Sequence, residues 1–275
     1  APCIGLAAAL VERRDINAVM LVTPADHVIE PIAEFQRAVR AAVQTAEDSP
    51  EPLVAFGIQP TFPATGYGYI HRHGGEIARR SGVAEYIVES FREKPAADLA
   101  EKFVASGEYF WNAGIFVWKA TALMAELHSQ KPELAKGVER IADAWESSDR
   151  DAVLRRTYPT LEKISIDYAV MEHAREVRVL QAPFRWDDVG SWLALERMHP
   201  QDAGGNTVLA THSGINTSHC VIVGDDPKRV ITTIGVNNLL IIQDGDATLV
   251  ADRREEGTVK QLVDQLKQKG LDRYL

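Results

Sequence analysis

The hydrophobic positions of this chain fall into short continuous runs separated by stretches with helical spacing. Residues 18–22 (AVMLV) and 53–58 (LVAFGI) are two such runs. Continuous apolar runs are typical of strands that are buried on both faces of a sheet. Between them, residues from about 32 to 45 carry apolar side chains at helical spacing. This strand–helix–strand order predicts an α/β fold with a right-handed crossover.

The middle of the chain continues the alternation. Residues 83–91 alternate between apolar and polar positions and are followed by Pro95, which predicts an antiparallel or edge strand. Apolar residues at helical spacing predict two helices within about 120–146. Residues 177–180 (VRVL) are predicted to form the next strand.

The pattern changes after residue 206. Short β-rich runs recur at intervals of about 8–12 residues, which predicts a small all-β unit, either a sandwich or a coil of short strands. The capping-box pattern Thr258-x-x-Gln261 predicts a final helix. We therefore expect a larger α/β domain at 1–203 and a smaller β-rich domain with a terminal helix at 204–275. The β-rich runs are 220–223, 230–233, 239–242 and 248–250.

Composition narrows the classes of function. The chain has 275 residues and a formal net charge of −9, which argues against a general nucleic-acid-binding or anionic-membrane surface. Local cations in a cleft could still bind an anionic substrate. Cys3 and Cys220 lie far apart without zinc-ligand spacing, as is typical of a protein of the reducing cytoplasm. No apolar run approaches the roughly 18 residues of a membrane span, and the opening residues lack the basic region of a signal peptide.

Acidic side chains follow three of the predicted strands. Asp26 follows the first strand, Glu93-Lys94 the alternating strand, and Asp187-Asp188 the strand at 177–180. Ligands of an open α/β sheet collect beyond the carboxyl ends of its strands. Asp26 and one of the paired aspartates could therefore share Mg²⁺ with substrate phosphates. On spacing alone each acidic loop is more commonly a helix cap or a solvated turn, and both interpretations stay open.

Two further stretches could contact a ligand. Gly66 and Gly68 lack a Cβ, so the backbone of ATGYGYI could approach a ligand closely. A tight turn is the alternative, which the loop alone favours. Asn112 lies in an apolar run, where a buried amide must hydrogen-bond either to the backbone or to a ligand such as a sugar hydroxyl. The sequence contains no P-loop, no dinucleotide fingerprint and no histidines with metal-ligand spacing.

Six stretches are specific when they are taken together and in order. They are PADHVI, FGI-x-PT-x-PATGYGYI, FREKP, SGEYFWNAGIFVWK, KISIDYAVME and WDDVGSW. In this order and separation they resemble the mannose-1-phosphate guanylyltransferase family across essentially the whole chain. The resemblance implies transfer of GMP from GTP to mannose 1-phosphate, with release of pyrophosphate and use of Mg²⁺.

The resemblance also implies roles for particular residues. It makes Asp26 and Asp188 the metal-binding, catalytic carboxylates, and Asp187 a neighbour or a helix cap. It places Lys94 near the phosphate as a further catalytic residue. The residues that it implies as contacts to the sugar are Gly68, Glu93 and Asn112.

The fold implied by the resemblance is a Rossmann-like nucleotidyltransferase domain followed by a short left-handed β-helix and a terminal helix. The β-rich tail could form the interface of a homodimer. One departure concerns the family's opening GG-x-G-x-R loop and downstream PK motif, which bind the triphosphate and are absent here. We therefore expect the natural protein to carry a strand–loop–helix–strand segment upstream of Ala1, which would place the strand at 18–22 within its sheet. We expect the 275 residues alone to bind GTP poorly and not to turn it over.

Two rival functions stay open. One is a nucleotidyltransferase for another sugar 1-phosphate, such as glucose 1-phosphate. The other is a catalytically silent regulatory subunit that senses a sugar nucleotide, against which the presence of both Asp26 and Asp188 argues. Some members of the family carry a fused phosphomannose isomerase, and we expect none within these residues because the chain ends soon after the predicted final helix.

Overall fold

The chain divides into two compact units. The computed structural model describes residues 1–49 and 51–274, and the units are Ala1–Trp186 and Asp187–Leu275. Contacts group residues 187–203 with the second unit, and the domain boundary near residue 203 that the sequence suggested stays a prediction. None of the described helices is long and apolar enough to cross a membrane.

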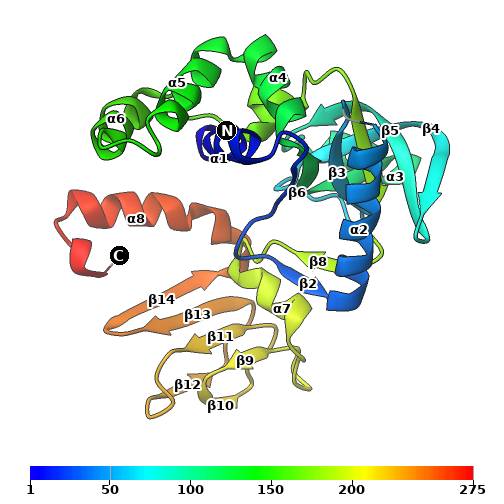
Figure 1. The fold of residues 1–275 in the computed structure, drawn as a ribbon. Helices are drawn as coiled ribbons and strands as arrows, with labels where there is room; N and C mark the ends of the chain where they lie inside the picture. The colour runs from blue at the N-terminus through cyan, green and yellow to red at the C-terminus, as the bar shows by residue number, and fades with distance from the viewer. Residues whose placement is uncertain (50, 275) are drawn as a thin grey trace. The chain divides into compact units, whose positions relative to one another are not determined.

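The first unit is built on a six-stranded sheet (Figure 1). The strands of this unit are β1 (Val19–Val22), β2 (Val28–Glu30), β3 (Leu53–Ile58), β4 (Tyr69–Arg80), β5 (Val83–Arg92), β6 (Tyr109–Lys119), β7 (Val177–Gln181) and β8 (Arg185–Asp187). Its helical segments are α1 (Pro2–Arg14), α2 (Ile32–Asp48), α3 (Ala97–Ser106), α4 (Ala120–Gln130), α5 (Pro132–Asp143), α6 (Arg150–Thr157), the 3₁₀ turn η1 (Tyr158–Thr160) and the π-helical η2 (Asp167–Met171). The order in the sheet is β1–β6–β3–β7–β5–β4, and β2 pairs separately with β8.

Helices cover both faces of this sheet. Successive residues of β3 point to opposite faces, so Leu53 and Ala55 join the core formed with α1, α4 and α5. Val54 and Phe56 join the core formed with α2 and α3. Every residue of β3 is buried, because a strand between two helical layers has no solvent face. The predicted α/β class is confirmed.

The sheet is mixed and curls round on itself. β3 and β7 are parallel, whereas β5 is antiparallel to β7, as its alternating sequence predicted. β4 pairs with both β5 and β6, and Tyr69 lies opposite Arg92 on one side and Trp111 on the other. The end of β5 therefore lies beside the start of β4, and β4 connects it to β6. This arrangement corrects the expectation that the end of β5 would lie at the edge formed by the carboxyl ends of parallel strands.

β1 occupies the edge of the described sheet. Its one neighbour there is β6, and Leu21 is 42% exposed. A second neighbour for this strand stays a prediction.

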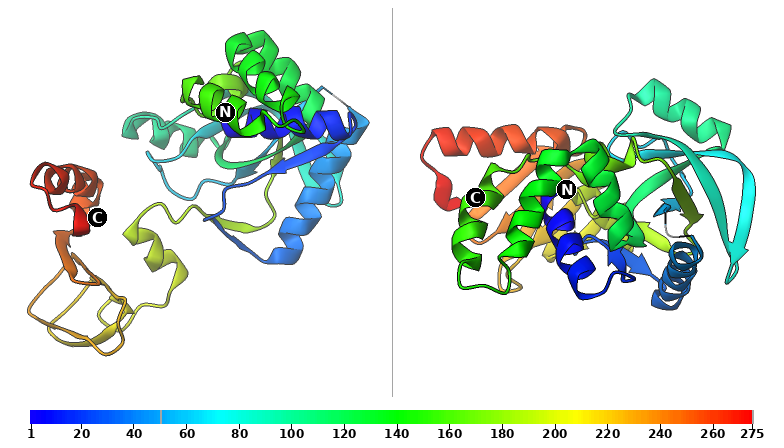
Figure 2. Two further views of the ribbon diagram at one scale, coloured as in Figure 1. Left: turned by 60° about the vertical axis from the view of Figure 1, so that its left-hand side comes forward. Right: turned by 45° about the horizontal axis from the view of Figure 1, so that its top comes forward.

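The second unit is a coil of short strands followed by a helix. β9, β11 and β13 are parallel neighbours, β10 and β12 form a second parallel pair, and β14 adds antiparallel to β13. The chain thus alternates between two sheets around a core that contains Cys220, Ile222 and Ile241, and Figure 2 shows this winding. Of the two architectures that the sequence left open for this unit, the structure shows the coil of short strands and not the sandwich. The segments are η3 (Trp192–Ala194), α7 (Leu195–Met198), β9 (Thr207–Leu209), β10 (Thr211–Ile215), β11 (Val221–Gly224), β12 (Val230–Ile234), β13 (Leu239–Asp244), β14 (Ala247–Asp252), η4 (Arg253–Thr258), α8 (Val259–Gln268) and η5 (Asp272–Tyr274).

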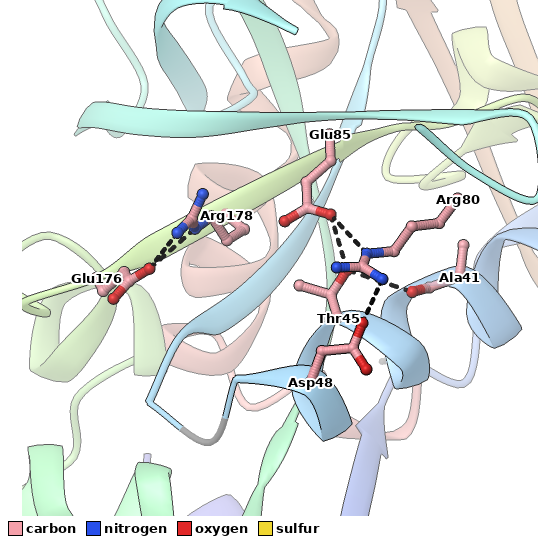
Figure 3. Close-up of polar contacts among 7 residues, drawn as sticks. All are labelled: Ala41, Thr45, Asp48, Arg80, Glu85, Glu176 and Arg178. Atoms are coloured by element: carbon pink, nitrogen blue, oxygen red, sulfur yellow. Dashed lines mark hydrogen bonds and ion pairs between the residues drawn. The ribbon is translucent and has the colours of Figure 1, made fainter. Parts of the chain in front are cut away.

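A charge network around the buried Glu85 joins α2 to the β4–β5 hairpin (Figure 3). The Glu85 side chain is 4% exposed and accepts from the Arg80 Nε at 3.1 Å and from the Thr45 hydroxyl at 2.9 Å. Arg80 also bonds Asp48 at the end of α2. A buried carboxylate is tolerated only with such partners, because it loses its hydration. The network therefore fixes where the hairpin lies against α2.

We predict that Arg80→Ala destabilises the protein. The substitution leaves the Glu85 carboxylate buried with one hydroxyl donor, and breaking such a pair costs about 3 kcal/mol, at the low end of the usual range because Arg80 is partly exposed. Arg79→Ala on the same strand is the matched control, because Arg79 pairs with Glu76 in the solvent and exposed pairs contribute little. Urea unfolding measures both free energies, and equal stability of the two variants would contradict this role for the network.

Candidate functional site

Three segments of the first unit meet at Gly68. A Cβ at this position would lie 2.5 Å from Glu93 Oε2 and 3.4 Å from the Asn112 Cβ, so only glycine leaves both side chains where they are. The Asn112 N–H donates to the Gly68 carbonyl at 2.8 Å. The structure thus brings together the three residues predicted to contact a sugar.

A β-bulge in β6 directs the Asn112 side chain. Gly57 pairs with Asn112 and Ala55 with Phe116, so three residues of β6 oppose one residue of β3 between these pairs. Bulges of this kind re-aim side chains and are common beside functional sites. Gly114 lies in the bulge at φ +66° and donates its N–H to Asn112 Oδ1 at 3.1 Å. The amide therefore satisfies a backbone group that the bulge removes from the ladder.

The Glu93 carboxyl is held beside a cation and near other acids. Lys94 Nζ lies 3.5 Å from Glu93 Oε1, and the two side chains are 64% and 20% exposed. Burial raises the pKa of Glu93, the charges of Asp167 and Glu172 raise it further, and Lys94 opposes the shift. Lys94 adopts φ +45°, a conformation that is uncommon outside glycine, and donates its N–H to the Tyr67 carbonyl. This hydrogen bond fixes the backbone of Lys94 just after the end of β5.

The loop that carries Asp26 contacts the same bulge. Asp26 is exposed in the turn after β1. A Cβ at Gly114 would lie 3.7 Å from Pro24 and 3.9 Å from the His27 ring, so this loop packs against β6. The Trp186 indole N–H donates to His27 Nδ1 at 3.0 Å. Since Trp186 opens the stretch WDDVGSW, this bond joins that stretch to the stretch PADHVI within the first unit.

The neighbouring residues Asp187 and Asp188, both in the second unit, have different hydrogen-bond partners. Asp187 Oδ1 accepts from the Val189 N–H, and both of its oxygens accept from Arg197. Asp187 therefore stabilises a turn and is not a helix cap, because η3 begins after Ser191 without a side-chain cap. Asp188 Oδ1 accepts from the Gly190 N–H at 3.3 Å. A Cβ at 190 would lie 2.8 Å from Asp188 Oδ2, so glycine leaves space beside that oxygen.

The predicted metal site consists of two residues in different units. Asp26 belongs to the first unit and Asp188 to the second, so their sharing of a metal stays a prediction. Within residues 1–49 and 51–274, no three His, Cys, Asp or Glu side chains form a group that could hold a metal ion. Two carboxylates completed by phosphate oxygens nevertheless suit Mg²⁺, a hard cation that prefers such ligands and seldom has an all-protein cage.

One residue of the site was missed from the sequence. Asp167 lies in the stretch KISIDYAVME, and its Oδ1 accepts from Asn112 Nδ2 at 2.8 Å. The signal was present, because Asp167 is an acid within an otherwise largely apolar segment. Only the fold, however, brings it to Asn112, which lies 55 residues earlier. Together the carboxylates and the amide offer the acceptors and donors that a polyhydroxylated ligand requires.

The fold and this site define a class of protein. Residues 1–204 match the nucleotidyl transferase family and residues 210–266 match the MannoseP isomerase/GMP-like β-helix domain. The chain belongs to the nucleotidyl transferase family.

Several individual proteins are similar to this chain. A mannose-1-phosphate guanylyltransferase of Klebsiella pneumoniae is 37% identical, and the match covers 100% of this chain and 57% of that protein. The xanthan biosynthesis protein XanB of Xanthomonas campestris pv. campestris (strain B100) is 38% identical over 98% of this chain and 56% of its own length. A crystal structure described as mannose-1-phosphate geranyltransferase from Thermus thermophilus is 33% identical, with a TM-score of 0.81, over 96% of this chain and 75% of that one. This chain thus spans little more than half the length of the two sequence relatives.

We predict that Gly68→Ala displaces the Glu93 carboxylate. The added methyl group would lie 2.5 Å from Glu93 Oε2, and movement into water, away from Asp167, lowers the raised pKa of Glu93 towards its ordinary value. Gly66→Ala is the matched control, because a Cβ there meets nothing within 4 Å. Carbon-13 NMR titration of the Glu93 carboxyl measures the effect. An unchanged titration in Gly68→Ala would show that the close approach at Gly68 does not position Glu93.

Proposed function

We propose that this protein transfers GMP from GTP to mannose 1-phosphate, giving GDP-mannose and pyrophosphate. The observation that carries the proposal is the convergence of Gly68, Glu93 and Asn112 in a chain of the nucleotidyl transferase family. Relatives named mannose-1-phosphate guanylyltransferase support the choice of sugar and nucleotide. The free thiols Cys3 and Cys220 support the expected cytoplasmic location.

The site suits a sugar phosphate that is held by its hydroxyl groups. The Glu93 carboxylate accepts hydrogen bonds and the Asn112 amide both donates and accepts. Lys94 is largely exposed beside Glu93, where its ammonium group can attract the phosphate of the bound sugar. A sugar held in this way would present its phosphate oxygen to the α-phosphorus of GTP. In-line attack forms the new P–O bond while the bond to the β-phosphate breaks and pyrophosphate leaves. Positioning of the two phosphates and neutralisation of their charge account for most of the catalysis in such a reaction.

Asp26 and Asp188 are the residues that would hold Mg²⁺. Arg197 and the Val189 N–H engage the Asp187 carboxylate, which argues against Asp187 as the metal ligand. A bound divalent cation supplies positive charge at the phosphate oxygens.

The proposed activity is tested by pyrophosphate release from the complete gene product. The reaction contains GTP, Mg²⁺ and either mannose 1-phosphate or glucose 1-phosphate. We expect a kcat/KM at least about tenfold higher with mannose 1-phosphate, which corresponds to about 1.4 kcal/mol of discrimination. Faster turnover of glucose 1-phosphate would assign the enzyme to the other sugar, and the absence of turnover with either sugar would favour the regulatory alternative.

We predict that Asp188→Asn lowers kcat/KM at least about a hundredfold and leaves the fold intact. The substitution removes a charged metal ligand with little change of volume, and a hundredfold loss corresponds to about 2.7 kcal/mol. Asp187→Asn is the neighbouring control. We expect it to lower the melting temperature through loss of the Arg197 pair. We expect it to lower kcat/KM less than Asp188→Asn does. Rates at limiting Mg²⁺ measure the difference, and wild-type turnover in Asp188→Asn would remove this carboxylate from the metal site.

A further inference from the structure

Asp167 occupies a distinctive backbone segment next to the sugar site. The π-helix η2 begins at this residue, and the Glu172 N–H donates to the Asp167 carbonyl across five residues. Single π-helical turns are uncommon and occur frequently at functional sites. Asp167 begins this turn and Glu172 follows its last residue, and the charges of both acids raise the pKa of Glu93.

The Asp167 carboxylate determines which way the Asn112 amide faces. Asn112 Nδ2 donates to Asp167 Oδ1, and Asn112 Oδ1 accepts from the Gly114 N–H. A flipped amide would place an oxygen against the carboxylate and an NH₂ group against an N–H donor, so both hydrogen bonds would be replaced by repulsive contacts. The structure therefore permits one orientation.

This orientation decides what remains for a ligand. One Nδ2 hydrogen and one Oδ1 lone pair of Asn112 are not used by Asp167 and Gly114. A flexible amide could exchange these two groups, and a site with exchanging donors and acceptors discriminates poorly between the hydroxyl arrangements of different sugars. A fixed amide presents its donor and its acceptor in constant positions.

We propose that Asp167 is a positioning residue of the sugar site, which fixes the donor edge of the Asn112 amide towards a sugar hydroxyl. The inference rests on the function proposed above and adds a residue to it. Asp167 acts in two separable ways. Its oxygen orients Asn112, and its charge opposes ionisation of Glu93, which Lys94 favours.

Two substitutions separate these effects. Asp167→Asn retains an oxygen that accepts from Asn112 but removes the charge, whereas Asp167→Ala removes both. Glu172→Gln is the control for charge alone, because no hydrogen bond joins the Glu172 side chain to Asn112 among the contacts of the described residues.

Steady-state kinetics of the complete gene product test the orienting role. At pH 8, Asp167→Ala is expected to raise the KM for mannose 1-phosphate about tenfold and to leave the KM for GTP within about twofold. Asp167→Asn and Glu172→Gln are expected to keep the sugar KM within about threefold of the wild-type value. An unchanged sugar KM in Asp167→Ala, or an equal rise in both KM values, would overturn the proposal.

The effect of charge gives a second readout. Ionised Glu93 accepts a sugar hydroxyl, so kcat/KM should fall as the pH decreases through the raised pKa of Glu93. Asp167→Asn lowers that pKa, and the acid limb of the profile should move to lower pH. Glu172→Gln should move it less, because Glu172 contributes less to the shift.

NMR titration of Glu93 without substrate distinguishes failure of this inference from failure of the proposed function. A lower pKa in Asp167→Asn supports the coupling of the two carboxyls even if mannose 1-phosphate is not turned over. An unchanged pKa in an enzyme that does turn over mannose 1-phosphate refutes the charge effect and leaves the proposed function standing.

Discussion

The bulge in β6 is the constraint on which the site depends. β6 pairs with β3 along both of its halves, but it changes partner on its other side from β4 to β1. The bulge lies at this change, and its residue Gly114 requires a left-handed conformation. Asn112 lies two residues before Gly114. The Asn112 N–H donates to the Gly68 carbonyl, and Asn112 Oδ1 accepts from the Gly114 N–H. The same strand therefore organises the sheet and positions the amide.

The site places several charged side chains close to one another. Glu93, Asp167 and Glu172 carry like charges, and Lys94 is the cation that lowers the pKa of Glu93. Partial burial strengthens these interactions relative to water. Hydroxyl groups of a bound sugar would donate to the Glu93 carboxylate and replace its lost hydration. An arrangement that is electrostatically unfavourable when empty is thus suited to a neutral ring attached to a phosphate.

The sequence predicted the elements with clear periodicity and missed those without it. β3 was predicted at its observed bounds, and α2, α4, α5 and α8 were predicted within a few residues, because apolar spacing reports burial directly. β6 was not recognised as a strand, since its continuous apolar run is interrupted by the residues of the bulge. The predicted capping box at Thr258 does not form a side-chain cap, because its hydroxyl donates to the Glu255 carbonyl instead. Gly68, Glu93 and Asn112 were candidates from the sequence itself and were assigned to the sugar through the family resemblance. Asp167 was missed, because only the fold brings it close to Asn112.

The most direct measurement is a crystal structure of the complete gene product with mannose 1-phosphate and Mg²⁺. The account predicts that sugar hydroxyls lie within about 3.2 Å of the Glu93 carboxylate and of Asn112 Nδ2, with the Asn112–Asp167 bond intact. A sugar bound away from Glu93 and Asn112, or an Asn112 amide turned away from Asp167, would contradict it.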